Sequence, residues 1–319
     1  MSRARPVAPT RADVLDASTR IAGLVRPVTI VESQGLGEGA VLAIETLQPT
    51  GSFKVRGALT ALMPLASGTR IVTASAGNHA LAIAHAAAVL ELEGTVVLPQ
   101  SASPAKRLPL EHYDVDVIEY GKSFDAAERR AIRLASKNGR YISPYNDRLV
   151  IAGAGTLAVE LLKRLEGALT VVSPMGGGGL AAGVALWATQ RPGTRVIGVN
   201  VEASDAMVRA LAAGRITKIK VGETLADSLA GNIEPGAVTF DLVQRYVESV
   251  VTVSERELEA GMRFLATHHG LIVEGAGAAA VAAALAGKVE APSGRLVPLV
   301  TGRNVAAPDF AKVLRSRRR

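Results

Sequence analysis

The chain has 319 residues, of which 48% are hydrophobic, 20% charged and 3% aromatic. This length predicts one large and one smaller lobe, and the composition excludes the disordered and collagen-like classes. The few aromatic residues argue against surfaces that stack nucleic-acid bases. The formal net charge is +7, but six arginines stand near the two ends: Arg3, Arg5, Arg315, Arg317, Arg318 and Arg319. Without a clustered basic face, we expect no binding to nucleic acid.

The chain contains no cysteine, which excludes disulfides and thiolate metal sites and fits a reducing compartment. The N-terminal segment lacks the apolar core of a signal peptide, and the longest apolar stretch, residues 275–287, is too short to span a bilayer. None of the five histidines has metal-ligand spacing on one helix face. We therefore expect a cytoplasmic protein that binds neither a membrane nor a metal ion.

Short β-branched runs alternate with longer Ala- and Leu-rich segments, which predicts an α/β protein with a mainly parallel sheet. The predicted strands are residues 40–44, 70–74, 95–98, 115–120, 170–173, 196–199, 250–253 and 296–300. The predicted helices are residues 10–23, 52–66, 78–92, 123–138, 152–166, 179–190, 254–269 and 276–287. Ser254 and Glu257 have the spacing of a capping box. Open sheets of this kind bind ligands beyond the carboxyl ends of their strands, so the loops there are candidate sites.

The first such loop, residues 48–58, carries Lys54 behind a Pro-Thr-Gly turn. Ser52 is the predicted N-cap, which places Lys54 and Arg56 in the first turn of a helix. The positive end of a helix disfavours an ammonium group, and burial lowers the pKa of a lysine further. Lys54 is thus a candidate for the free amine that a Schiff base requires. The alternative is a solvated lysine on an exposed turn.

Three other loops follow predicted strands. Residues 75–79 form a small-residue turn that opens a helix, so they are either an anion site or a plain N-cap. Residues 176–179 are four consecutive glycines before a helix, which lets the backbone approach a phosphate closely. A mere connector would not need the entropic cost of four glycines. Residues 301–304 place the Thr301 hydroxyl where a heterocyclic nitrogen could be hydrogen-bonded.

The glycine loop also has a second interpretation. Gly176, Gly178 and Ala181 satisfy the dinucleotide-binding pattern, and Glu202 lies past the next strand, near the place of a ribose-binding acid. A nicotinamide-dinucleotide-binding protein is therefore an alternative. It leaves Lys54, the loop at Asn78 and Thr301 unexplained.

Six motifs together resemble the fold type II pyridoxal-phosphate (PLP) enzymes, and within them the threonine/serine ammonia-lyases, or dehydratases. The resemblance extends from about Ala17 to Asn304. Its motifs are residues 45–58 (ETLQPTGSFKVRGA), 75–79 (SAGNH), 150–156 (VIAGAGT), 176–179 (GGGG), 273–278 (VEGAGA) and 301–304 (TGRN). It implies two open, mainly parallel α/β lobes with the cofactor in the cleft between them. Residues 1–60 and 148–319 would form the large PLP-binding domain, and residues 61–147 a small mobile domain.

The same resemblance implies the roles of the site residues. Lys54 would carry PLP as a Schiff base and would be the catalytic residue. The cofactor-binding residues would be Phe53, Lys54, Asn78, Gly176, Gly177, Gly178, Gly179, Leu180, Glu274 and Thr301. The carboxylate of a small amino-acid substrate would bind at Ser75, Gly77, Asn78 and His79. The implied assembly is a homodimer.

The implied reaction converts L-threonine and/or L-serine into a 2-oxo acid and ammonia. Lys54, displaced from PLP by the substrate amine, would remove the Cα proton, and the neutral Thr301 would favour elimination over transamination. The alternative substrates are other β-hydroxy amino acids, namely a hydroxyaspartate or a hydroxyectoine-derived compound. Racemisation of an amino acid is a further alternative.

Four departures from the family pattern bear on these alternatives. Ala76 stands where racemases have a serine, which disfavours racemisation. Asn200 stands where metal-dependent members have a glutamate, so we expect no divalent cation there. Ser228 replaces a glycine, as in dehydratases proposed to act in hydroxyectoine breakdown, and Leu81-Ala82 replace Gln-Gly. Both of these last changes are expected to touch the pocket and to shift substrate choice.

Overall fold

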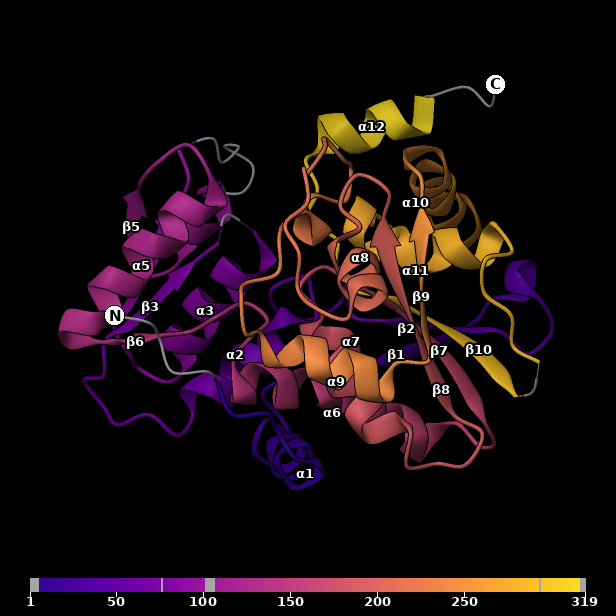
Figure 1. Cartoon of the computed structure of the whole chain (residues 1–319), viewed down its shortest axis with the longest axis horizontal. Coiled ribbons are helices and arrows are strands. Elements are labelled where there is room, and N and C mark those ends of the chain that lie inside the picture. The colour runs from indigo at the N-terminus through magenta and orange to yellow at the C-terminus, as the bar shows by residue number, and fades with distance from the viewer. Residues whose placement is uncertain (1–5, 76, 101–106, 293, 316–319) are drawn as a thin grey trace.

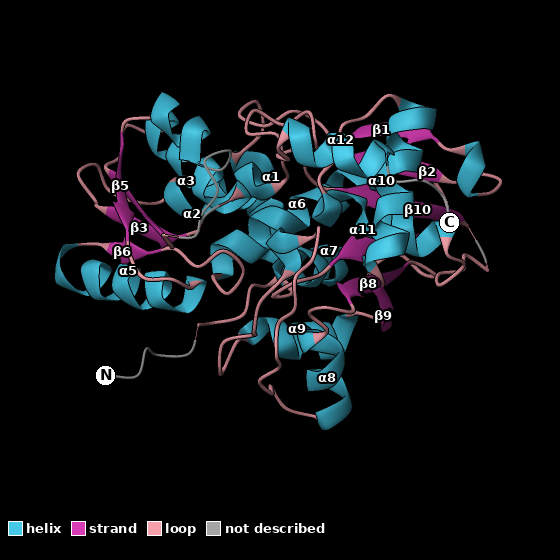
Figure 2. Ribbon diagram, turned by 90° about the horizontal axis from the view of Figure 1, so that it is seen from above, coloured by secondary structure: helices cyan, strands magenta, loops and turns pink. Residues whose placement is uncertain are grey.

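The computed structural model describes residues 6–75, 77–100, 107–292 and 294–315. The described residues form two separate β-sheets, each covered by helices (Figure 1). One sheet has six strands in the order β1-β2-β10-β7-β8-β9, and the other has four in the order β5-β4-β3-β6. Figure 2 shows the smaller sheet, with α3 and α5, on one side of the molecule and the larger sheet on the other.

The six-stranded sheet is parallel except at one edge, where β1 pairs antiparallel to β2 with Thr29 opposite Ile44. The four-stranded sheet is parallel throughout. The strands of the larger sheet are β1 (Thr29–Glu32), β2 (Val41–Ile44), β7 (Leu169–Pro174), β8 (Arg195–Val201), β9 (Ser249–Val253) and β10 (Arg295–Val300). Those of the smaller sheet are β3 (Ile71–Ala74), β4 (Gly94–Leu98), β5 (Val115–Glu119) and β6 (Arg140–Tyr141).

Helices cover both sheets. The α-helices are α1 (Arg11–Arg20), α2 (Lys54–Leu62), α3 (Asn78–Val89), α5 (Phe124–Asn138), α6 (Arg148–Arg164), α7 (Gly179–Ala188), α8 (Ala206–Ala213), α9 (Val238–Tyr246), α10 (Glu255–His269), α11 (Gly275–Leu285) and α12 (Ala307–Arg315). Short 3₁₀ turns are η1 (Gln34–Leu36), η2 (Leu108–His112) and η3 (Asp227–Leu229).

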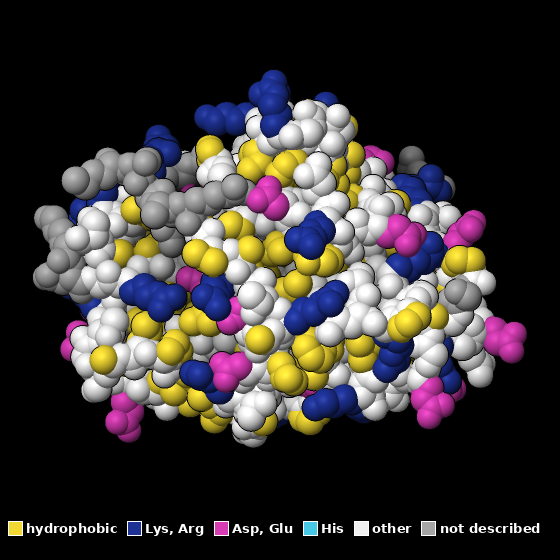
Figure 3. Space-filling view, turned by 60° about the horizontal axis from the view of Figure 1, so that its bottom comes forward, with side chains coloured by type: hydrophobic (Ala, Val, Ile, Leu, Met, Phe, Trp, Pro, Cys, Tyr) yellow, Lys and Arg dark blue, Asp and Glu magenta, His cyan; other side chains and the backbone are white. Residues whose placement is uncertain are grey.

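The surface shows no obvious segregation of charge on the face drawn in Figure 3, where lysine and arginine side chains are dispersed among acidic and apolar ones. Among the described residues, no helix combines the length and the hydrophobicity that crossing a bilayer requires. Of the six terminal arginines, Arg315 alone lies within the described ranges.

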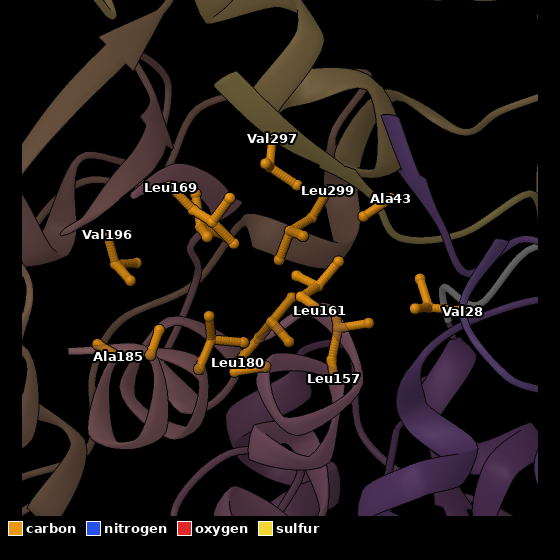
Figure 4. Packing of buried hydrophobic residues seen from close by; sticks show 14 of the residues in the cluster. Val28, Ala43, Leu157, Leu161, Leu169, Leu180, Ala185, Val196, Val297 and Leu299 are labelled. Carbon is orange, nitrogen blue, oxygen red and sulfur yellow. The ribbon is translucent and has the colours of Figure 1, made fainter. Parts of the chain in front are cut away.

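The core of the larger sheet lies on both of its faces, because alternate residues of a strand point to opposite sides. Val171 of β7 packs in a cluster with α6 and α7, whereas the adjacent Val172 packs against α11. Figure 4 shows the first cluster, in which Leu161 of α6 and Leu180 of α7 approach Leu299 of β10. The two-sided burial explains why these strands are mostly apolar along their whole length and do not alternate with polar residues.

All eight predicted strands and all eight predicted helices are present, with ends shifted by up to four residues. The predicted capping box is confirmed, since Ser254 accepts from the Glu257 N–H and Glu257 accepts from the Ser254 N–H. The predicted N-cap Ser52 is wrong. Helix α2 begins at Lys54 behind Phe53, because the backbone of Ser52 is instead bridged to Gly302.

A buried ion pair fixes the start of α2. The guanidinium of Arg56 is fully buried, and it donates to Glu45 from Nε (2.7 Å) and Nη2 (2.8 Å). Its Nη1 donates to Glu160 of α6 at 2.6 Å and to Thr156 at 3.1 Å. The end of β2, the first turn of α2 and the distant helix α6 are therefore joined at Arg56, two residues after Lys54.

We expect Arg56→Ala to lower the free energy of unfolding by about 3–5 kcal/mol, because the change leaves the buried carboxylate of Glu45 without its partner. Urea denaturation measures this loss. The matched control is Arg20→Ala, which breaks an exposed pair with Asp16 and should cost below about 1 kcal/mol. Equal losses in the two variants would show that the buried pair does not stabilise the fold.

Candidate active site

One cavity of about 270 Å³ brings the predicted site residues together. It lies where the loops after β2, β3, β7 and β10 meet, at the carboxyl ends of strands from both sheets. Every one of the predicted residues lines it: Phe53, Lys54, Ser75, Gly77, Asn78, His79, Gly176, Gly177, Gly178, Gly179, Leu180, Glu274 and Thr301. The prediction that these loops share one cleft is therefore confirmed, whereas the role of each residue remains a prediction.

Lys54 is the first residue of α2, and its side chain borders the cavity. Its Nζ donates to the carbonyl oxygen of Pro144 at 2.7 Å and lies 5.2 Å from the centre of the Phe53 ring. Burial lowers the pKa of Lys54 from 10.5 to about 8, although the nearby carboxylate of Glu274 opposes this shift. The amine is therefore enclosed by protein, which differs from the alternative of a solvated lysine on an exposed turn.

The four glycines, residues 176–179, lie between β7 and α7, and Gly178 is the N-cap of that helix with φ +88°. A Cβ atom on Gly177 would lie 2.4 Å from Cγ of Tyr145, and one on Gly179 would lie 2.9 Å from the Tyr145 carbonyl oxygen. Only glycine fits this close approach. Because the first N–H groups of a helix have no partner within it, the loop presents donors suited to an anion.

A hydrogen-bonded chain joins the other two loops. Asn78 donates from Nδ2 to Glu274 Oε1 (2.5 Å), and its Oδ1 accepts from Nδ2 of Asn304 (2.7 Å). The Thr301 carbonyl accepts from the N–H of Phe53 at 3.0 Å, so the loop of Thr301 is joined directly to that of Lys54. These contacts fix the amide of Asn78. They also hold the loop of residues 301–304 against the loops of Asn78 and Lys54.

His79 lies in the first turn of α3 and is 2% exposed. Its Nε2 is 3.4 Å from the Ile142 carbonyl, and its Nδ1 is buried without a hydrogen-bond partner among the described residues. Burial, and secondly the charge of Lys54, lower the pKa of His79 to about 3. The imidazole is therefore neutral at physiological pH. Ser75 accepts from the N–H of Gly77 at 3.2 Å and so shapes the same turn.

Of the residues that depart from the family pattern, some line the cavity and others do not. Ser228 lines the cavity opposite Gly77, but Leu81 and Ala82 pack into hydrophobic clusters of α3 and do not line it. The expectation that these two residues touch the pocket is therefore wrong. They lie on the faces of the helix that turn toward the smaller sheet and toward α2. Ala76, on which the expectation about racemisation depends, lies outside the described residues.

Asn200 is buried at the end of β8, where its Nδ2 donates to the Met175 carbonyl and its Oδ1 accepts from Val208 N at 3.2 Å. The amide thus bonds to the residue before the glycine loop. Within the described ranges, no group of three His, Asp or Glu side chains is placed to hold a metal ion. Glu202, which the dinucleotide interpretation requires, is exposed and does not border the cavity.

Several cavity residues were not singled out from the sequence, among them Pro144, Tyr145 and Asp227. Pro144 and Tyr145 follow β6, a two-residue strand that is too short to give a sequence pattern. The signal that could have found them is Pro144, because proline fixes its own φ and so restricts the connection between β6 and α6.

The chain is thus an α/β protein with two mainly parallel sheets, whose strand ends converge on a buried lysine and on a glycine loop that offers helix N–H donors. The chain belongs to the family described as pyridoxal-phosphate dependent enzymes, whose model matches residues 21–302. Its fold is accordingly the fold type II arrangement, and its cofactor is pyridoxal phosphate.

Relatives with known names are similar over nearly the whole chain. An L-threonine ammonia-lyase of Thermotoga maritima is 36% identical over 93% of this chain and 76% of its own length. A catabolic L-threonine dehydratase of Escherichia coli K12 is 34% identical over 94% of both chains. Among solved structures, the threonine deaminase of T.th. has a TM-score of 0.84, with 35% identity over 93% of this chain and 99% of that one. Maize serine racemase has a TM-score of 0.89, with 28% identity over 96% and 97%.

We expect Gly177→Ala to weaken the binding of pyridoxal phosphate by at least about tenfold, because the added methyl collides with the Tyr145 ring and displaces the loop. Titration followed by the visible absorbance of the bound cofactor measures the dissociation constant. Gly222→Ala is the control, since its methyl would meet its nearest neighbour, Cβ of Ala203, at 3.4 Å. If the two variants bind the cofactor equally well, the glycine loop is not the anion site.

Proposed function

We propose that the chain is a pyridoxal-phosphate-dependent ammonia-lyase that converts L-threonine and/or L-serine into a 2-oxo acid and ammonia. One observation carries this proposal: the enclosed amine of Lys54 and the glycine loop border the same cavity. The named activities of the relatives support the choice of reaction, since two of them are L-threonine ammonia-lyases and others are L-threonine dehydratases.

The residues around the cavity fit the cofactor. The pKa of the Lys54 amine is lowered, the glycine loop offers N–H donors at a helix N-terminus, and the buried Nδ1 of His79 lacks a partner among the described residues. Buried polar atoms without a partner are rare unless a ligand or water satisfies them. We assign the covalent attachment to Lys54 and the phosphate to residues 176–179. The further cofactor contacts would be Phe53, Asn78, Leu180, Glu274 and Thr301.

When bound, pyridoxal phosphate supplies an electron sink that stabilises negative charge at the substrate Cα. Lys54 serves as the base that takes the Cα proton, because a pKa of about 8 leaves an appreciable fraction of the amine unprotonated near neutral pH. The Pro144 carbonyl accepts a hydrogen bond from this amine and limits where it can point. Thr301 offers a neutral hydroxyl, which cannot stabilise a positive charge on a ring nitrogen as a carboxylate would.

The N-terminus of α3 is the proposed site of the substrate carboxylate. Ser75, Gly77, Asn78 and His79 surround it, and free helix N–H groups favour a negative charge. Lys54 is the sole Lys or Arg among the described residues that line the cavity. A second carboxylate on the substrate would therefore have no Lys or Arg to pair with among the described lining residues, which favours threonine and serine over a hydroxyaspartate.

We also propose the finer organisation that the family resemblance implies. Residues 61–147 would form a small mobile domain, which is supported by the smaller sheet lying wholly within residues 71–141. The absence of cysteine supports a cytoplasmic location. The dispersed charges on the face in Figure 3 support the absence of nucleic-acid binding. Dimers are usual in the family that the sequence resembles, so a homodimer is the proposed assembly.

The proposed reaction predicts a clear order of substrates. Release of 2-oxo acid should be fast with L-threonine or L-serine and at least about tenfold slower, in kcat/KM, with 3-hydroxyaspartate, because the second carboxylate lacks a partner. A panel of L-threonine, L-serine, 3-hydroxyaspartate and a hydroxyectoine-derived β-hydroxy amino acid measures this order. Faster turnover of the dicarboxylate than of threonine would contradict the proposed substrate.

The same substrates are also given to two variants. Lys54→Ala should lose the release of 2-oxo acid, whereas the control Lys288→Ala should keep it, since Lys288 is paired with Glu257 away from the cavity. Retained activity in Lys54→Ala would overturn the proposed mechanism.

The lowered pKa of Lys54 predicts a pH dependence of cofactor capture. The attacking amine must be unprotonated, so the rate at which cofactor-free protein takes up pyridoxal phosphate should rise with pH and level off above about 8. A lysine with an ordinary pKa of 10.5 would still gain rate at pH 10.

Dividing this rate by that of free N-acetyl-lysine at each pH corrects for the titration of the cofactor. Between about pH 8 and 10 the unprotonated fraction of the free amine still rises steeply, because its pKa is the ordinary 10.5. Lys54, with a pKa of about 8, is mostly unprotonated over this range. The ratio should therefore fall by about five- to sevenfold per pH unit, about fortyfold in all, between about pH 8 and 10. A ratio that stays constant over this range would show that the pKa of Lys54 is not lowered.

A further inference from the structure

The segment 143–146 connects the two parts of the molecule. It runs from β6 of the smaller sheet to α6, which packs on the larger sheet. Its Pro144 carbonyl accepts the hydrogen bond from Nζ of Lys54 at 2.7 Å. The next residue, Tyr145, is thus attached directly to the group that holds the lysine amine.

Tyr145 also contacts the glycine loop. Its ring lies against the Cα of Gly177, since a Cβ atom there would be 2.4 Å from Cγ and 2.5 Å from Cδ2. Its backbone lies against Gly179, where a Cβ atom would be 2.9 Å from the carbonyl oxygen. One residue therefore contacts the loop from two directions, while the preceding residue contacts the amine.

The far end of the Tyr145 ring is held as well. Its Oη accepts from the N–H of Glu234 at 2.9 Å, and the neighbouring Asn146 donates to the Glu234 carboxylate at 2.5 Å. Asn146 also accepts from Val238 N at 3.0 Å, at the start of α9. The ring is thus fixed between α9 and the loop, and it packs in the cluster that contains Met175. A side chain held at both ends can act as a spacer.

We propose that Tyr145 is a positioning residue whose ring sets the distance between the Lys54 amine and the glycine loop. This inference rests on the proposed function, because it assumes that the loop holds the phosphate of the cofactor. The ring, and not the hydroxyl, makes the contact with Gly177. A change in the position of the loop would therefore act on the phosphate of the cofactor, which the loop is proposed to hold.

The test compares dissociation constants for pyridoxal phosphate and for pyridoxal, which lacks the phosphate. In the wild type, pyridoxal phosphate should bind more tightly. Tyr145→Ala should weaken pyridoxal phosphate by at least about tenfold and pyridoxal by less than about threefold, because only the phosphate contribution is lost. Tyr145→Phe retains the ring and should stay within about threefold of the wild type for both compounds.

Tyr246→Ala is the control for a lost aromatic ring, since Tyr246 packs against the core away from the cavity and should leave the ratio of the two constants unchanged. If Tyr145→Ala shows no cooperative thermal transition, Tyr145→Leu, which keeps apolar bulk but not the flat ring, is measured by the same ratio. Equal weakening of both compounds, no weakening, or a Tyr145→Phe loss as large as that of Tyr145→Ala would overturn the proposal. A wild type that binds neither compound would instead refute the proposed function.

Discussion

The site depends on one buried charge. Arg56 lies two residues after Lys54 in the first turn of α2, where the positive end of the helix disfavours a cation. Glu45 and Glu160 offset this with charge-assisted hydrogen bonds, and Thr156 satisfies a further donor hydrogen. Because Glu45 follows β2 and Glu160 belongs to α6, the pair fixes the beginning of α2 against both a strand and a helix. Lys54 can therefore be held in a place where its own amine is poorly solvated.

The other loops are positioned relative to this fixed point by backbone contacts. The loop of Lys54 pairs with that of Thr301 through Phe53 and through the bridge between Ser52 and Gly302. The glycine loop begins where β7 ends, and β7 is the direct neighbour of β10 in the same sheet. Parallel strands bring their carboxyl ends to one edge, so residues far apart in the sequence converge there without long connections.

The parts of the fold that the sequence predicted are those with strong local patterns. Strands such as β7 and β8 are buried on both faces and consist mostly of apolar residues, and helices such as α10 carry a capping box. Two strands were missed because their patterns are weak: β6 has two residues, and the edge strand β1 has two exposed positions out of four. Three helices, α8, α9 and α12, were also missed, and each has only eight or nine residues. The glycine loop and Lys54 were recognisable because glycine runs and motif spacing are local. Tyr145 and two partners of Arg56, Thr156 and Glu160, were not. The contacts of Arg56 with these two join residues about 100 positions apart, and the contact of Tyr145 depends on a backbone approach that only the folded chain reveals.

The amide of Asn78 has a consequence for how the cavity admits a molecule. Asn78 opens α3, beside the smaller sheet, whereas Glu274 and Asn304 stand on the side of the larger sheet. Sliding the two parts past each other would break both hydrogen bonds at once. A swing that keeps Asn78 as its pivot would leave both intact and spread the cavity walls that lie farther away. This single side chain therefore ties the two parts of the molecule at one point, so any displacement between them must either turn about Asn78 or break these two hydrogen bonds.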